Sequence, residues 1–420
     1  MLRANWRSWP SRVLVLLVVV GMLVGACAAP AATPTQAPAP AAKPAKPAVY
    51  KVGHMVPLTG TSADLGQDFR RTAELALEDI NKAGGVNGTP LEIVTEDHQG
   101  EPQQGVTAFR KLADVDKVPF ILSAWSVIVM ATAPIADDKK VVLMNNAANA
   151  ESIRGAGKFV VSSYPLSGYE MTVLARYLNK EMGIKKPASI YANTDAGKWN
   201  SEAFCEEFKR LGSPCVTREA FEANAVDYAP QLLKIKSLAP EILHMAPTNT
   251  SQFPQIVKQM GDLGLAPTIK PVSYVGFELL SMFDVAGAAA DKAVYSSVAP
   301  PDDLPEVQDF VKRFKAKFNK DVTGLGWNVY VYDSFFLVKE LLEYMESKGY
   351  TYTGENVLKA IYEKKTFAST KLTGATEFSA DGTVYKPVTI KRVNVPAKKF
   401  EWISLVRPKG DGLETLRKAQ

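Results

Sequence analysis

Histidine and cysteine are scarce in this sequence, with three of each among 420 residues. None of the histidines lies in an H-E-x-x-H pattern, and the chain has neither a G-x-S-x-G elbow nor a glycine-rich loop suited to phosphate. Asp97 and His98 could join Ser126 in a hydrolytic triad, but we interpret them as the polar end of a loop. We therefore expect a protein that is not an enzyme and that has no catalytic residue, metal site or cofactor.

The chain also lacks a strong excess of charge of either sign. The net charge is +5, and three of these charges come from arginines in the first twelve residues, where no acidic residue occurs. No basic patch stands out in the rest of the chain, so nucleic acid is not expected as a partner. With 46% hydrophobic residues, the about 370 residues of the body can build two domain-sized cores.

The first 27 residues have the layout of a secretory signal. A basic start leads into the apolar run 13–24, which is shorter than the roughly 20 residues that span a bilayer. An N-terminal membrane anchor that stays on the protein is the alternative. The run ends in Val24-Gly25-Ala26-Cys27, which resembles a bacterial lipobox and implies that Cys27 becomes the lipidated first residue of the mature chain. We therefore expect an extracytoplasmic protein, anchored by a lipid to the bacterial membrane.

Residues 28–48 consist almost entirely of Ala, Pro, Thr and Lys, a composition that cannot bury enough apolar surface to fold. Their prolines favour an extended tether that would reach on the order of 60 Å. Outside the cytoplasm, the two remaining cysteines, Cys205 and Cys215, are candidates for a disulfide, with two unpaired thiols as the alternative.

Strand and helix patterns alternate along the body. In 66–85, for example, apolar residues recur at helical spacing and Gly84-Gly85 supply a stop. Before Pro165 this reasoning predicts strands at 49–60, 89–98, 118–124 and 140–148 and helices at 66–85, 102–114 and 127–138. After it, helices are predicted at 166–183, 198–212, 228–238 and 250–264, and strands at 188–193, 215–221, 241–247, 268–276 and around an Asp381-Gly382 turn in 377–395. The two alternating series predict an α/β protein with two doubly wound parallel-sheet lobes facing a cleft.

In open α/β sheets, ligands bind beyond the carboxyl ends of the strands. This rule directs attention to the segments that follow the predicted strands: 58–66, 123–127, 145–149, 194–200, 247–251 and 274–278. We expect the ligand to bind among them, with Asn249 as one of the contributing residues.

The segment VPLTGTSADLGQDFRRTAELALEDINKAGGVNGTPLEIVTED, residues 56–97, resembles the opening of the branched-chain amino acid (Leu/Ile/Val) substrate-binding proteins of ABC transporters. Residues 123–151 and the late helix 327–345 match later segments of that family. The resemblance covers about 50–402 and implies a type I periplasmic-binding-protein fold with a three-crossing hinge. It also implies a monomer that delivers its ligand to the permease and ATPase subunits of an importer. A ligand-sensing receptor module that feeds a signalling partner is the alternative.

The resemblance also assigns ligand residues. In the family, the ligand carboxylate is held by a serine loop after the third strand and a small-residue loop after the fourth. The matching residues here are Ser126, Ala147, Ala148 and Asn149. Free backbone N–H groups where a helix starts at Val127 favour an anion at the same place. Trp199 stands where the family has an aromatic residue that closes over the ligand, and Leu65 where a tyrosine often lines the pocket.

The residue that would neutralise an amino acid's ammonium group is harder to assign. It should fall near Tyr274, and Glu278 is the nearest acidic candidate. Because an unpaired buried ammonium costs several kcal/mol, an amine-free carboxylate competes with an amino acid as the ligand. The aromatic side chains near the expected cleft favour an aromatic one; they are Trp125, Tyr164, Trp199 and Tyr274.

These inferences give a division of the chain. We expect a lipoprotein signal at 1–27, a tether at 28–48, lobe 1 at 49–166 plus 297–372, lobe 2 at 167–296 plus 373–408, and a tail at 409–420. Hinge crossings are expected near 162–168, 295–300 and 371–374.

Overall fold

The computed structural model describes residues 46–419. The expected signal segment, the lipidation of Cys27 and nearly all of the tether lie outside the described residues. From Lys46 onward the chain belongs to one compact unit. No helix in this described part combines the length and the apolar character needed to cross a bilayer.

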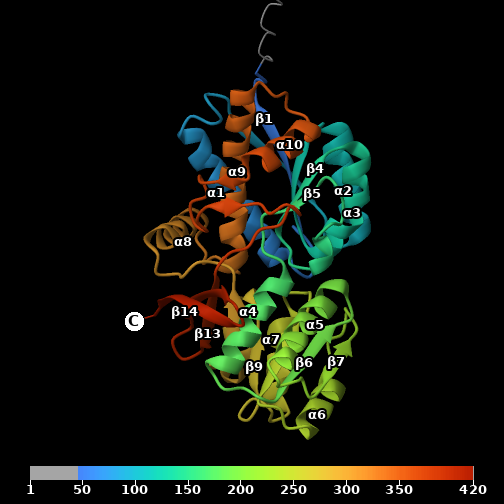
Figure 1. Ribbon diagram of the computed structural model, residues 1–420, viewed down its shortest axis with the longest axis vertical. Coiled ribbons are helices and arrows are strands. Elements are labelled where there is room, and N and C mark those ends of the chain that lie inside the picture. The colour runs from blue at the N-terminus through green and yellow to red at the C-terminus, as the bar shows by residue number, and fades with distance from the viewer. Residues whose placement is uncertain (1–45, 420) are drawn as a thin grey trace, which may run out of the picture. The chain divides into compact units, whose positions relative to one another are not determined.

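The first lobe is built on a five-stranded sheet whose neighbouring strands all run parallel (Figure 1). The strand order is β2-β1-β3-β4-β5, with β1 (Tyr50–Val56), β2 (Leu91–Asp97), β3 (Phe120–Ala124), β4 (Val142–Ala147) and β5 (Val160–Ser162). The sequence predicts the first four strands. It does not predict β5, whose three residues are too few to show a periodic pattern.

The second lobe has an eight-stranded sheet in the order β15-β14-β13-β10-β9-β8-β6-β7. Strands β6 to β10 are parallel, and β13 to β15 are added antiparallel. Their bounds are β6 (Pro187–Ala192), β7 (Arg218–Phe221), β8 (Ile242–Ala246), β9 (Lys270–Ser273), β10 (Val294–Ser297), β13 (Val388–Asn394), β14 (Lys399–Lys409) and β15 (Gly412–Lys418). The expected tail at 409–420 is wrong, because β15 pairs with β14 as a strand of this sheet.

Helices follow the parallel strands in both lobes, which confirms the predicted α/β fold. In the first lobe α1, α9 and α10 pack together on one side of the sheet, and α2 and α3 on the other (Figure 1). The helices are α1 (Ala63–Lys82), α2 (Pro102–Arg110), α3 (Ser126–Lys139), α4 (Ser167–Lys180), α5 (Asp195–Arg210), α6 (Ala229–Ser237), α7 (Gln252–Asp262), α8 (Pro305–Phe318), α9 (Leu325–Lys348) and α10 (Gly354–Lys364). Short 3₁₀ or π turns lie at Lys111–Val115, Glu151–Ile153, Val275–Phe277, Met282–Ala286 and Gly287–Ala290.

The D-I-N-K-A-G-G segment at the end of α1 fixes this helix to its neighbours. Asp79 binds Arg313 of α8 at 2.6 Å, and the Asn81 side chain both donates to and accepts from the backbone of Leu91 at 2.9 Å. Gly84 and Gly85 then have φ of 98° and 65°, where a side chain would be strained. The segment thus ends α1 and fixes the start of β2 relative to the end of this helix.

The chain passes between the two sheets at three places: between β5 and α4, between β10 and α8, and before β13. The third passage lies later than the expected 371–374. Asp333 of α9 accepts the N–H groups of Lys371, Leu372 and Thr373 at 2.6–3.0 Å, and the Gly382 carbonyl accepts from the Ser162 N–H. The short β11 (Thr366–Phe367) and β12 (Thr376–Glu377) therefore stay with the first lobe.

Cys205 of α5 and Cys215 of the loop before β7 form a disulfide, with Cα atoms 5.5 Å apart. Replacing both by serine is expected to lower the free energy of unfolding by about 2.5 kcal/mol, because the unfolded chain regains the entropy of a closed loop. Urea unfolding of the double variant measures this. Reductant should shift the wild-type midpoint to that of the variant and leave the variant unchanged; equal midpoints before reduction would contradict the prediction.

Candidate ligand-binding cleft

A cavity of about 360 Å³ lies between the two lobes. It is bordered by segments that follow parallel strands of both sheets, where open α/β sheets bind ligands. The first lobe contributes Gly100, Glu101, Pro102, Trp125, Ser126, Val127, Ala147, Ala148, Asn149 and Trp327. The second lobe contributes Thr194, Ala196, Glu222, Ala223, Asn224, Thr248, Asn249, Thr250, Phe253 and Tyr274.

Seven of the ten residues predicted to bind ligand line this cavity: Trp125, Ser126, Ala147, Ala148, Asn149, Asn249 and Tyr274. Two of these, Ser126 and Asn149, keep hydrogen-bond donors available. The Ser126 hydroxyl accepts the Ala150 N–H at 3.1 Å, which leaves its own hydrogen free to donate. Asn149 is 7% exposed, and its Nδ2 has no hydrogen-bond partner among the residues that the structure describes. Both donors can therefore serve an acceptor in the cavity.

The start of α3 adds to this donor set. The first N–H groups of a helix have no partner within it, and the helix dipole is positive at this end. Ser126 is the first residue of α3, and Val127 beside it also lines the cavity. A carboxylate bound here would receive donors from the helix start, Ser126 and Asn149 together.

Ala147 and Ala148 contribute less than the resemblance implies. Their N–H groups point to the Oδ1 of Asn145, at 3.3 and 2.8 Å. The fully buried Asn145 thus holds the loop in shape and uses the two backbone donors. The alanines therefore offer only their small side chains to the cavity.

Trp125 occupies a strained place in the cavity wall. Its φ is 66°, which is unusual for a residue with a large side chain, and its carbonyl accepts from the first turn of α3. The indole packs against Phe69 at 5.9 Å and against His98 at 6.1 Å, measured between ring centroids. Burial lowers the pKa of His98 to about 4, so this ring is neutral at physiological pH. Packing against these two rings thus helps to fix Trp125.

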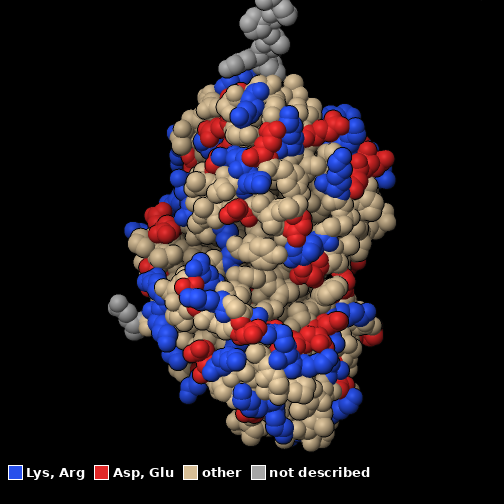
Figure 2. Space-filling model, viewed as in Figure 1, with Lys and Arg blue, Asp and Glu red and all other residues tan. Residues whose placement is uncertain are grey.

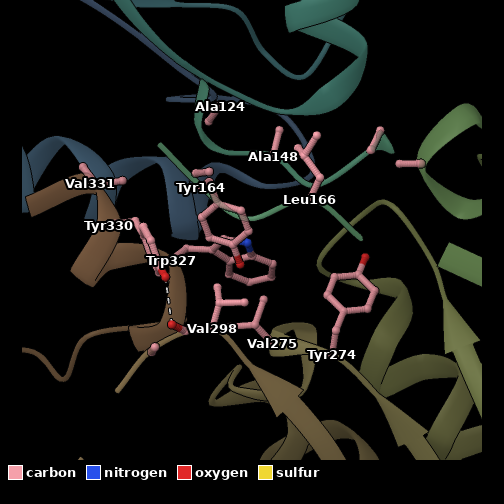
Figure 3. Close-up of a cluster of buried hydrophobic side chains, with 14 of the residues drawn as sticks. Ala124, Ala148, Tyr164, Leu166, Tyr274, Val275, Val298, Trp327, Tyr330 and Val331 are labelled. Carbon is pink, nitrogen blue, oxygen red and sulfur yellow. Dashed lines mark hydrogen bonds between the residues drawn. The ribbon is translucent and has the colours of Figure 1, made fainter. Parts of the chain in front are cut away.

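Three more aromatic residues complete the apolar part of the cavity. Trp327 projects from α9 of the first lobe, and Tyr274 faces the same region from the second lobe (Figure 3). Phe253 of α7 packs edge-on against Tyr274 at 5.4 Å. The Tyr274 hydroxyl donates to the Pro247 carbonyl at 2.8 Å, so its polar end is already occupied. The cavity therefore joins a polar corner on the first lobe to aromatic walls.

Leu65 and Trp199 do not line the cavity. Leu65 is fully buried in the core, where its side chain lies beside Gly324 at the start of α9. Trp199 is 40% exposed on α5, where the start of the same helix, Thr194 and Ala196, faces the cavity instead. The predicted aromatic cover over the ligand is therefore not seen at Trp199.

Glu278 is also absent from the cavity wall. Its side chain is 1% exposed, and its carboxylate pairs with the ammonium group of Lys391, while its Oε2 accepts the Gly326 N–H at 2.7 Å. Desolvation raises the pKa of Glu278, and the charge of Lys391 counteracts that rise. The expected ammonium partner is thus already engaged within the protein.

The suggested triad is contradicted as well. Asp97 accepts the N–H groups of Leu58 and Gln99, both at 2.8 Å. His98 Nδ1 accepts the Gly100 N–H, and Ser126 is bound to Ala150. Each of the three side chains therefore accepts hydrogen bonds from different backbone N–H groups, and they are not arranged as a triad.

The charges on the cavity lining are few and negative. Glu101 of the first lobe and Glu222 of the second are exposed at the rim, and no Lys, Arg or His lies among the described lining residues. On the outer face in Figure 2, by contrast, basic and acidic side chains are interspersed. A carboxylate would therefore be held by dipoles and hydrogen bonds.

Several lining residues were missed in the sequence. Glu222 follows β7 directly, so the strand-end rule would have found it had it been applied to that strand. Trp327 lies at the start of α9, more than 150 residues beyond Asn149 in the chain, and no strand-end pattern points to it. Its place depends on the packing of α9 against α1 and β4 of lobe 1.

Comparison with known proteins agrees with this site. A sequence model of the periplasmic binding protein family matches residues 49–399. The chain belongs to this family. It is thus a substrate-binding protein of the ABC-transporter type and not an enzyme, and family membership implies an extracytoplasmic location. The last strand of the second sheet, β15, lies beyond the matched residues.

Individual periplasmic binding proteins are distant in sequence and close in fold. A Leu/Ile/Val-binding protein homolog of Brucella melitensis is 22% identical over 338 residues, which cover 80% of this chain and 89% of that one. The leucine binding protein LivK of Thermotoga maritima has a TM-score of 0.75 at 22% identity, covering 86% of this chain and 99% of its own. A solute binding protein of Rhodopseudomonas palustris, in complex with 4-hydroxybenzoate, has a TM-score of 0.72 at 20% identity, covering 89% and 96%.

Proposed function

We propose that this protein is the extracytoplasmic solute-binding component of an ABC importer for a small carboxylate with an aromatic body. The observation that carries the proposal is the unpartnered, buried Asn149 Nδ2 beside the Ser126 hydroxyl at the start of α3. These donors suit a carboxylate. The aromatic walls suit a flat apolar group, with Trp125, Tyr274 and Trp327 nearest.

The absence of a free buried acid among the described lining residues favours a ligand without an amine. Glu278 is bound to Lys391, and the two acids of the lining, Glu101 and Glu222, are exposed. An ammonium group would find only solvent-screened partners, which are worth little. Structural neighbours include proteins in complex with 4-hydroxybenzoate and benzoate as well as one with isoleucine.

The binding cycle follows from the two lobes. The ligand would bind first to Ser126 and Asn149 of lobe 1, and lobe 2 would then close over it by rotation about the three crossings. Closure is favoured to the extent that the ligand makes additional contacts in the closed state, here with Tyr274 and Phe253. The permease and ATPase subunits would receive the ligand from a protein held at the membrane through Cys27.

A thermal-shift screen of residues 44–420 tests the proposal, because the described part of this range, 46–419, belongs to one compact unit. A ligand at 100 times its Kd adds about 2.7 kcal/mol of stability, which should raise the Tm by several degrees. We expect shifts with benzoate and 4-hydroxybenzoate and none with benzamide or leucine. A shift with leucine alone would refute the amine-free ligand and indicate that Glu101 or Glu222 reaches the ammonium group.

A further inference from the structure

Glu278 joins the second lobe to the first turn of α9. Its Oε2 accepts the N–H of Gly326 at 2.7 Å, and its backbone carbonyl accepts the N–H of Gly324 at 3.0 Å. Helix α9 packs on α1 and β4 of the first lobe, whereas Glu278 follows β9 of the second. One residue of lobe 2 therefore binds two N–H groups at the start of a lobe 1 helix. The residue that follows Gly326 is Trp327, which lines the ligand cavity.

The first turn of α9 is built for this close approach. Gly324 has a φ of 64°, in the left-handed region that favours glycine. A Cβ on Gly326 would lie 2.7 Å from the Glu278 carboxylate and 2.3 Å from Val275, so no side chain fits there. The helix start is thus held against lobe 2 by its backbone, and a carboxylate is favourable at this end of a helix.

Charge balance alone does not explain the placement of Glu278. Lys391, which has no exposed side-chain surface, also pairs with Asp302 and would keep a counter-ion without Glu278. The Tyr295 hydroxyl donates to Glu278 Oε1 at 3.3 Å, on the same oxygen as Lys391. Lys391 and Tyr295 therefore fix one oxygen of the carboxylate, and the other is directed at Gly326.

We propose that Glu278 is a positioning residue, which holds the first turn of α9 from the opposite lobe and thereby sets Trp327 in the wall of the ligand cavity. Its effect on ligand binding rests on the proposed function, because it acts through an aromatic wall of that cavity. The position of Trp327 itself does not depend on which ligand binds.

The test uses ¹⁹F NMR of the whole protein labelled with 5-fluorotryptophan, without ligand, with each resonance assigned by a single Trp→Phe change. Glu278→Ala is expected to shift or broaden the Trp327 resonance while that of Trp199, on the exposed side of α5, stays in place. Glu207→Ala is the matched control, since it breaks another largely buried ion pair of lobe 2, the one with Arg176 (Glu207 side chain 9% exposed). It should lower the Tm and leave Trp327 unchanged.

An unchanged Trp327 resonance in Glu278→Ala, with a loss of Tm like that of Glu207→Ala, would overturn the proposal. If Glu278→Ala does not fold, Glu278→Asp gives the answer. It keeps the charge beside Lys391 but is one methylene too short to reach Gly326, so a displaced Trp327 supports the proposal and an unmoved one refutes it. 4-Hydroxybenzoate serves as a separate probe. A variant in which Trp327 is displaced should bind it about tenfold more weakly than the wild type. Failure of the wild type to bind this probe would refute the proposed function and leave the NMR result to stand alone.

Discussion

Replacing Asn149 by aspartate is expected to lower the affinity for an aromatic carboxylate at least about a hundredfold, which corresponds to about 2.7 kcal/mol. The two side chains have the same shape, but the change turns the unpartnered Nδ2 donor into a charged acceptor. Like charges placed together in an interface cost several kcal/mol. No Lys, Arg or His among the described lining residues stands ready to compensate for the new charge.

Isothermal titration with 4-hydroxybenzoate measures the effect, and Asn249→Asp is the matched control. Asn249 lines the same cavity from lobe 2, where its Nδ2 already donates to the Ala223 carbonyl at 3.2 Å. The same change of charge there should weaken binding much less. Equal losses in the two variants would show that the cavity disfavours any added negative charge and that the carboxylate does not sit at Asn149.

The sequence allowed the fold and the polar corner of the site to be predicted because both depend on local patterns. Helical spacing and Gly84-Gly85 define α1, and the alternation of strands and helices defines the two parallel sheets. The ends of β3 and β4 place Ser126 and Asn149 together, since neighbouring parallel strands end on the same edge of the sheet.

The remaining features depend on contacts between distant parts of the chain. Glu278 stands in a strand-end segment as expected, but Lys391 and Gly326, which bind it, are 113 and 48 residues away. The strand β15 similarly carries no internal core pattern, because both of its faces are largely exposed and, among the described strands, only β14 pairs with it. Charge pairing and edge pairing of this kind leave no periodic signal in the sequence.

The three histidines excluded from catalysis have a large expected effect on stability. Burial lowers the pKa of His54 and of His244 to about 3 each, with His98 and Arg218 adding to the respective shifts. Because these folded-state values lie below the ordinary 6.5, the unfolded chain takes up protons first as the pH falls. The free energy of unfolding is therefore undiminished by these histidines above pH 6.5. It falls progressively toward pH 3, by about 3 kcal/mol per histidine at pH 4.5.

His54 gives the sharpest test, since neither of its ring nitrogens has a partner among the described residues and its ring packs edge-on against Phe335 at 5.4 Å. His54→Leu removes the titrating group without breaking a hydrogen bond. The stability of this variant relative to the wild type, from urea unfolding, should improve by about 3 kcal/mol between pH 7.5 and pH 4.5. Met55→Leu, at the neighbouring buried position, should show no such change.

The difference in unfolding free energy between variant and wild type is the relevant quantity, because Glu170 changes the stability of both with pH in the opposite sense. Burial raises the pKa of Glu170 to about 7, so its contribution is present below about pH 4.5 and is lost as the pH rises through 7. A difference between His54→Leu and wild type that stays constant with pH would mean that His54 takes up its proton equally in the folded and unfolded chains.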